Sequence, residues 1–205
     1  MMPRRAFSFL LLCASLALWV AGSTPALARS FNTVVIDAGH GAHDFGANRS
    51  AFFEKHIALD ISRRLERFLR KNGVRTVMTR STDRFIPLNT RADIGNRTGR
   101  CVFVSVHVND ARRSSASGIE TFYHTSEGQK LAALVQREIL RNTKHGGNRG
   151  VKFARFKVLR SSTKPAILVE TGFASNREDQ QRLRDPRYRE AIAQSIGIGL
   201  LKYRR

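Results

Sequence analysis

Cysteine is almost absent from this sequence, which holds two cysteines in 205 residues. One of them, Cys13, falls in an N-terminal stretch with the features of an export signal, so that Cys101 would remain alone in the mature chain. A single cysteine excludes an intramolecular disulfide, and stability must then come from a hydrophobic core, a bound metal or both. We expect Cys101 itself to act as a small buried hydrophobe.

A long hydrophobic run is also missing, because the one apolar stretch is too short for a membrane span. A basic N-terminus leads into an almost wholly apolar run from Ala6 to Ala21, and Ala26-Leu27-Ala28 has the small-x-small pattern of a signal-peptidase site. A membrane span needs ~20 apolar residues, which argues against a retained anchor. We therefore expect a signal peptide over residues 1–28 and export of residues 29–205 to the periplasm, the medium or the cell wall.

The export route is left open by the same segment. Arg4 and Arg5, followed by Phe7, resemble a twin-arginine signal, whose machinery moves folded proteins. Pro3 and Ser8 depart from the usual flanking residues of such signals. General secretion and the twin-arginine route are therefore both kept as alternatives.

Acidic residues are scarce, with 16 against 36 basic residues. The expected signal peptide holds two of the basic residues and none of the acidic ones, which leaves a net charge of +18 (34 minus 16) for the mature chain. Such a surface favours a polyanionic partner, either nucleic acid or the acidic polymers of a cell envelope. A solubilising surface, with arginine stems covering apolar helix faces, is the plainer alternative.

No linker, internal repeat or low-complexity block divides the mature chain, whose length suits one domain with a proper core. Apolar runs typical of strands alternate with apolar stripes at helical spacing. We expect strands at Thr33–Asp37, Val74–Thr79, Cys101–Val108, Gly118–Tyr123 and Ala166–Glu170. We expect helices at Phe53–Lys71 and Leu88–Thr98, a third through Leu131, Leu134, Val135 and Ile139, and a last one through Tyr188, Ile192, Ile196 and Leu200. Residues 151–159 stay unassigned. The expected fold is α/β, a single domain with a mostly parallel or mixed central sheet covered by helices on both faces.

Three of the expected strands lead into residues that can bind a metal or move a proton. His40, His107 and Glu170 each lie at or just beyond the end of an apolar run. Functional groups of open α/β sheets gather beyond the carboxyl ends of the strands. Two imidazoles and a carboxylate, with a position left open for water, form a common catalytic zinc site, and Glu54 is the natural third ligand.

Each of these residues also has a purely structural interpretation. His40 would then be a hydrogen-bonded loop residue, His107 a satisfied core histidine, and Glu54 a carboxylate that favours its helix dipole. Glu170 is harder to explain in this way, because burying a carboxylate costs several kcal/mol unless a partner or a function holds it.

Five segments in order carry a resemblance to a known family. They are "IDAGHGAHDFGA" followed by Glu54-Lys55, "MTRSTDRFIPLNTRADIGN", "SVHVNDA", "GIETFYH" and "ILVETGFASNREDQ". Together they resemble the zinc-dependent N-acetylmuramoyl-L-alanine amidases of the cell-wall amidase 3 family, and the resemblance runs from about Thr33 to Tyr203.

The resemblance implies one zinc ion per chain and an enzyme that hydrolyses the amide between N-acetylmuramic acid and the L-alanine of the stem peptide. It implies that the zinc ligands are His40, Glu54 and His107 and that Glu170 is catalytic. It further implies supporting roles for Arg91, Asn96 and Asn109. The glycines around His40, which are Gly39, Gly41 and Gly46, are expected to let the backbone turn tightly beside the metal. We expect no ligand role for His43, His56, His124 and His145.

Peptidoglycan is the partner that the resemblance implies, with no nucleic acid and no membrane span after processing. Some members of the family carry a long occluding insertion after the third ligand segment, but here only Ala111 to Ser117 separates "SVHVND" from "GIETFY". We therefore expect no obligatory activator. A zinc peptidase, a catalytically silent envelope-binding module and a secreted nucleic-acid binder are the rival functions, and the last of these rests on charge alone.

Overall fold

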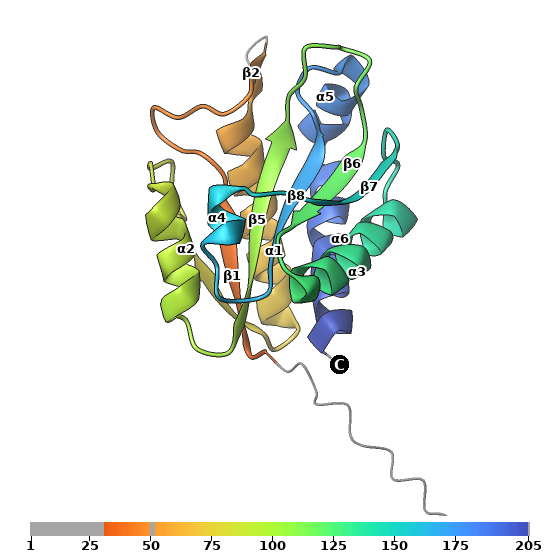
Figure 1. The fold of residues 1–205 in the computed structure, drawn as a ribbon. Coiled ribbons are helices and arrows are strands. Elements are labelled where there is room, and N and C mark those ends of the chain that lie inside the picture. The colour runs from red at the N-terminus through yellow and green to blue at the C-terminus, as the bar shows by residue number, and fades with distance from the viewer. Residues whose placement is uncertain (1–30, 50–51, 205) are drawn as a thin grey trace, which may run out of the picture.

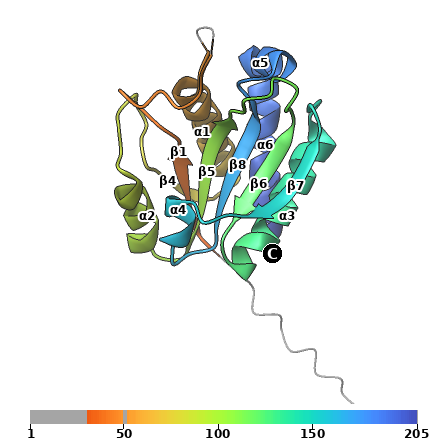
Figure 2. The same ribbon diagram turned by 45° about the horizontal axis from the view of Figure 1, so that its top comes forward.

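A six-stranded sheet runs through the centre of the protein in the order β4-β1-β5-β8-β6-β7 (Figures 1 and 2). The computed structural model describes residues 31–49 and 52–204, and the expected signal peptide lies outside them. The strands of the sheet are β1 (Thr33–Ala38), β4 (Arg75–Met78), β5 (Cys101–Asn109), β6 (Ile119–Tyr123), β7 (Asn148–Phe153) and β8 (Ala166–Phe173). Strands β4, β1, β5 and β8 run parallel, whereas β6 is antiparallel to β8 and parallel to β7. The sheet is therefore mixed, as expected.

Helices cover both faces of this sheet, which confirms the predicted fold class (Figure 1). One face carries α1 (Glu54–Lys71), α3 (Ser126–Asn142) and α6 (Pro186–Arg204), and the other carries α2 (Leu88–Arg97) and α4 (Lys157–Arg160). Helix α5 (Arg177–Arg184) packs against β8 and α6. A small hairpin of β2 (Asn48–Arg49) and β3 (Phe52–Phe53) precedes α1.

The core divides into two clusters because neighbouring side chains of a strand point to opposite faces. In β1, Val34 and Ile36 belong to the larger cluster under α1, α3 and α6, while Val35 belongs to a smaller cluster with Phe103 and Leu168 under α2 and α4. Both faces of the central strands are thus buried, which explains their continuous apolar sequence. Cys101 lies in the smaller cluster at 5% exposure, as predicted.

The structure also contains elements that the sequence pattern did not predict. Residues 151–159, left unassigned, are divided between the end of β7 and helix α4. Helix α5 has the sequence "REDQQRLR", and Leu183 is its one buried apolar residue, so no apolar stripe marks it. Strands β2 and β3 are two residues each, too short for any periodicity. In the part of the chain that the structure describes, no helix is both long and apolar enough to cross a membrane.

Candidate metal centre

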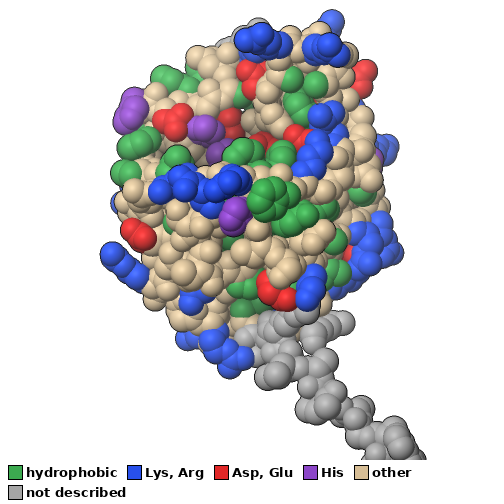
Figure 3. Space-filling model, in the orientation of Figure 1, with side chains coloured by type: hydrophobic (Ala, Val, Ile, Leu, Met, Phe, Trp, Pro, Cys, Tyr) green, Lys and Arg blue, Asp and Glu red, His purple; other side chains and the backbone are tan. Residues whose placement is uncertain are grey.

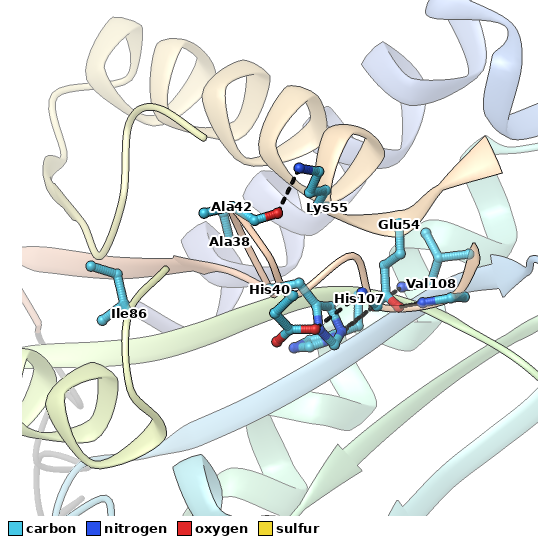
Figure 4. Close-up of polar contacts among 12 residues, drawn as sticks. Ala38, His40, Ala42, Glu54, Lys55, Ile86, His107 and Val108 are labelled. Carbon is cyan, nitrogen blue, oxygen red and sulfur yellow. Dashed lines mark hydrogen bonds and ion pairs between the residues drawn. The ribbon is translucent and has the colours of Figure 1, made fainter. Parts of the chain in front are cut away.

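His40, Glu54 and His107 converge at the carboxyl ends of β1 and β5 (Figure 4). His40 lies two residues beyond β1, Glu54 is the first residue of α1, and His107 lies within β5. One ligand atom from each residue lies within 4.8 Å of the other two. Glu54 Oε1 is 3.1 Å from His40 Nε2 and 2.8 Å from His107 Nδ1. The structure thus brings together the three residues that the sequence proposed as ligands.

Further hydrogen bonds fix the orientation of these side chains. His40 Nδ1 lies 2.8 Å from Asp44 Oδ1. Glu54 Oε2 accepts from the backbone N–H of Ala47 at 2.8 Å, and its Oε1 accepts from that of Val108 at 2.9 Å. Outer contacts of this kind set the tautomer and orientation of metal-binding side chains. Asp44 was not predicted, although it stands four residues after His40 in the same glycine-rich segment.

The loop after β1 has an unusual backbone. His40 and Ala42 have φ values of 60° and 51°, in the left-handed region that non-glycine residues rarely adopt. Such strain concentrates at functional sites, where the surrounding structure holds it in place. Gly46, at φ 65°, passes so close that a Cβ there would overlap the Glu54 carboxylate and lie 2.6 Å from His40 Cδ2. At Gly46, the absence of a side chain therefore allows the close approach of the backbone that we expected of the glycines in this turn.

Two buried arginines hold the strained loop. Arg91 of α2 donates to the carbonyl oxygens of Ala38 at 2.6 Å and His40 at 2.7 Å, and to Asp37 Oδ1 at 2.9 Å. Arg80, which has no exposed surface, also donates to the carbonyl oxygens of Ala38 and Gly39. Arg91 was predicted to support the site, whereas Arg80 was not singled out, although it lies inside a segment that carried the family resemblance.

Glu170 lies beside His107, because the two residues are register partners on β5 and β8. Its side chain is buried, and in the described structure its Oε2 has no hydrogen-bond partner. Burial, followed by the nearby carboxylates of Glu54 and Glu120, raises the pKa of Glu170 well above its usual value. A buried carboxyl group that shares its surroundings with two other carboxylates favours its protonated form.

The electrostatics of the three-residue cluster favour a positive charge. Burial would raise the pKa of Glu54, but the hydrogen bonds from His107 and His40 lower it below its usual value. Burial would lower the pKa of His40, but the hydrogen bonds and charges of Glu54 and Asp44 raise it. The cluster therefore attracts either protons or a metal cation, and the two compete for the same nitrogen atoms.

Comparison with known proteins identifies the family. Residues 34–202 match the Amidase_3 family, described as N-acetylmuramoyl-L-alanine amidase. The chain belongs to this family. It is 34% identical over 200 residues to the amidase LytC of Bacillus subtilis (strain 168), covering 91% of this chain but 40% of LytC. It is 30% identical to the amidase AmiA of Escherichia coli (strain K12), covering 83% of this chain and 75% of AmiA.

Solved amidase structures share the fold. The amidase AmiC2 of Nostoc punctiforme superposes with a TM-score of 0.81 at 41% identity, covering 85% of this chain and 97% of that one. The CwlD amidase of Clostridioides difficile, solved in complex with the GerS lipoprotein, gives a TM-score of 0.80 at 31% identity, covering 84% of this chain and 98% of that one. An amidase with this fold is thus found with a partner protein, and the expectation that this chain needs no activator gains no support from the comparison.

A second buried carboxylate, Glu120, accompanies Glu170 in this amidase. The two residues are register partners on the antiparallel strands β6 and β8, so their side chains share one face of the sheet. Glu120 accepts hydrogen bonds from Asn109 at 2.5 Å, Arg149 at 3.0 Å and Lys152 at 2.5 Å. Asn109, predicted to support the site, therefore acts on Glu120, which the sequence analysis did not single out.

Asn96 lies apart from the metal cluster. Its amide donates to the carbonyl oxygen of Ser161 at 2.9 Å and accepts from the backbone and hydroxyl of Thr163 at 2.8 and 3.0 Å. These bonds tie α2 to the segment that follows α4. Asn96 therefore supports the wall of the site from a distance and does not reach its centre.

A pocket of about 510 Å³ opens beside His40, His107 and Glu170. Its size lies in the usual range for ligand sites. Its apolar lining consists of Phe85, Ile86, Leu88, Phe156, Val158 and Leu168. Figure 3 shows this face of the amidase, with histidine and acidic side chains in a hollow and basic side chains around it.

The other histidines of the described chain, for which we expected no ligand role, are not among the three residues of the candidate cluster. His43 packs on Phe85 with ring centroids 4.5 Å apart, and His124 stacks on Phe153 at 5.1 Å. His56 meets Phe53 edge-on, and His145 Nδ1 accepts from the backbone of Gly147. These contacts give each of them a structural role.

Proposed function

We propose that this chain is a zinc-dependent peptidoglycan amidase that hydrolyses the amide bond between N-acetylmuramic acid and the L-alanine of the stem peptide. One observation carries the proposal. Two imidazoles and a carboxylate that come from three separate segments converge at one point, and the unpartnered carboxyl group of Glu170 lies next to them. Family membership supplies the reaction class.

The donor set fits zinc. Two nitrogens and one carboxylate oxygen are a ligand set used by catalytic zinc sites, which keep a further position for water or substrate. His40, Glu54 and His107 would hold the ion. The absence of a side chain at Gly46 leaves room for the Glu54 carboxylate and the His40 ring to approach each other.

Zinc, when bound, supplies Lewis-acid chemistry: it lowers the pKa of a bound water to ~7 and polarises a carbonyl group. Glu170 accepts the proton of the attacking water at its unpartnered Oε2 and returns it to the departing amine of L-alanine. Burial and the neighbouring carboxylates raise the pKa of Glu170, which favours its holding the proton between the two steps. Asp44 and Arg91 hold His40 in place during this cycle.

Activity without a partner protein is part of the proposal. Residues 110–118, which join β5 to β6, contain no helix, and none of them lines the pocket. The described connection thus provides nothing that covers Glu170 or the cluster. Export of the chain with removal of residues 1–28 is proposed from the sequence alone, and N-terminal sequencing of the secreted protein would test it.

Mass spectrometry of purified peptidoglycan digested by residues 29–205, with no other protein added, tests the proposed function. We expect free stem peptides that begin with L-alanine, that disappear on chelation and that return when zinc is added. Shortened stems on intact muramoyl links would indicate a peptidase. No product at all with zinc-loaded protein would contradict activity without an activator and leave a binding module as the rival.

A further inference from the structure

A pair of basic side chains faces the same side of the sheet as Glu170. Arg149 and Lys152 lie on the edge strand β7, and both contact Glu120, the register partner of Glu170. Glu170 is in turn the register partner of His107. Polar side chains therefore form a continuous row across the sheet. The row begins at His107 on β5, continues through Glu170 on β8 and Glu120 on β6, and ends at the two basic side chains on β7.

The two cations carry more charge than Glu120 neutralises. Glu120 contributes one negative charge, and its second oxygen already accepts a hydrogen bond from Asn109. The side chains of Arg149 and Lys152 remain 36% and 42% exposed. The guanidinium of Arg149 also lies over the ring of Phe173 at 4.7 Å, a cation–π contact that favours this position of the side chain. One excess positive charge is thus held in place and reachable from solvent.

The distance from Glu170 to this charge matches the length of a short peptide. Neighbouring strands lie about 4.8 Å apart, so β7 is about 10 Å from Glu170 on β8, two strands away. An extended chain advances roughly 3.3 to 3.6 Å per residue, so two or three residues span this distance. On the side of α2, which packs against β1 and β5, the pocket wall is apolar, with Phe85 and Leu88. The two flanks therefore differ in chemistry.

We propose that Arg149 and Lys152 bind a free carboxylate on the second or third residue of the stem peptide, so that the peptide leaves the reaction centre across β6 and β7. This inference rests on the proposed amidase function and adds a direction and a substrate preference to it. Arginine and lysine suit the task, because charge-assisted hydrogen bonds to a carboxylate are short and strong. Glu120 and Phe173 position Arg149 for this contact.

Paired substrates test the inference on the zinc-loaded protein. One is an N-acetylmuramoyl tripeptide whose second and third residues carry free carboxylates, and the other is the same compound with both carboxylates converted to amides. We expect the wild-type kcat/KM to be about ten-fold higher for the acid, as one charge-assisted hydrogen bond would give. The ratio should fall in 500 mM salt, because the cations are partly exposed.

Single-residue variants test whether Arg149 and Lys152 cause the preference for the acid substrate. Arg149→Gln and Lys152→Gln each leave Glu120 paired with the remaining cation, and each should bring the ratio of the two kcat/KM values close to one. Arg149→Lys keeps the charge and should retain most of the preference. Arg67→Gln makes the same charge change at an exposed position on α1 and should leave the ratio unchanged.

The outcomes separate this inference from the proposed function. Equal cleavage of both substrates by wild type, a preference that salt does not reduce, or a preference retained in both glutamine variants would overturn the inference and leave the amidase function standing. Cleavage of neither substrate by wild type would overturn both.

Discussion

Glu170 occupies a position in the fold that is costly for stability. It is nearly fully buried, its Oε2 has no hydrogen-bond partner in the described residues, and two further carboxylates lie nearby. Burying a charged or unpartnered polar group costs free energy of folding, which a purely structural residue would not retain. The proposed function gives a reason for it, because the reaction needs a proton acceptor beside the cluster of His40, Glu54 and His107.

Replacement of Glu170 should separate catalysis from metal binding. Glu170→Gln keeps the shape of the side chain and leaves His40, Glu54 and His107 untouched, so we expect one zinc ion per chain and a turnover lower by about 10²- to 10⁴-fold. His40→Ala removes a ligand and should lose both zinc and activity. Metal analysis of the purified variants, beside the peptidoglycan digest, checks this. A Glu170→Gln protein with near-wild-type turnover would exclude Glu170 as the base.

The raised pKa of Glu170 predicts how the stability of the metal-free protein depends on pH. Below the ordinary glutamate pKa of 4.5, both the folded and the unfolded chain carry the proton and no difference arises. As pH rises, the unfolded chain ionises while folded Glu170 stays protonated, so stability falls by up to about 1.4 kcal/mol per pH unit until the folded group ionises.

Glu170→Gln removes this titration. In chelator-treated protein, the variant should therefore melt at a higher temperature than wild type, by a margin that grows from pH 4.5 to pH 7.5. Glu178→Gln, at an exposed position on α5, is the matched control. A margin for Glu170→Gln that stays constant with pH would mean that the fold does not raise the pKa of Glu170.

Among the elements, the loop between β1 and α1 depends on glycine in a way that can be measured. Gly46 and Gly73 have almost the same backbone, with φ values of 65° and 70°. A Cβ at Gly46 would overlap Glu54, whereas nothing lies within 4 Å of a Cβ at Gly73. Both alanine variants should lose about 1 kcal/mol or more of stability from backbone strain.

The two variants should differ in metal binding. Gly46→Ala displaces Glu54 or His40 and should weaken zinc affinity by at least about ten-fold, as loss of ligand orientation does. Gly73→Ala should bind zinc as the wild type does. Thermal melts and a competitive zinc-chelator titration measure the two effects. Equal zinc affinity in both variants would show that the close approach at Gly46 does not hold the ligands.

The elements that sequence predicted well are those whose apolar pattern reports their burial. Strand β5 reads as a continuous apolar run because both of its faces are covered, and α1 has a clear apolar stripe ending at Asn72-Gly73. Helix α5 was not predicted because polar residues make many of its contacts. Among them, the side chain of Asn176 caps the helix by accepting from the backbone N–H groups of Glu178 and Asp179. Its contacts are hydrogen bonds of Asn176 and Asp179 and the burial of Leu183 alone, which leave no periodic apolar signal.

The residues of the candidate site were predicted only in part, because only some of them can be located from the pattern of the strands. His40 follows the end of β1, and His107 and Glu170 lie in the carboxyl-terminal halves of β5 and β8, toward the edge where a parallel sheet gathers its functional groups. Glu120 could not be placed from sequence, because β6 enters the sheet antiparallel to β8 and only that register puts it beside Glu170. Nothing local in the sequence specifies which strand pairs with β8.

At the scale of the whole molecule, charge is unevenly divided between the surface and the site. The mature chain would carry +18, yet the centre of the site gathers the carboxyl groups of Glu54, Glu120 and Glu170. Basic side chains surround the hollow on the face shown in Figure 3. An anionic polymer is therefore attracted to the basic surface in general, whereas the carboxyl groups at the centre of the site do not contribute to that attraction.

This division predicts that binding to whole peptidoglycan depends on salt. Exposed charges are screened beyond ~8 Å at physiological ionic strength, so long-range attraction from scattered arginines weakens as salt rises. The Glu170→Gln variant is used so that the peptidoglycan is not hydrolysed during the experiment. We expect the fraction of this protein that sediments with insoluble peptidoglycan to fall steeply between 50 and 500 mM NaCl. Binding to an uncharged polysaccharide, measured alongside, should be weak at every salt concentration. Retention that does not change with salt would instead assign the affinity to the pocket beside Glu170, where short contacts with the substrate are shielded from ions.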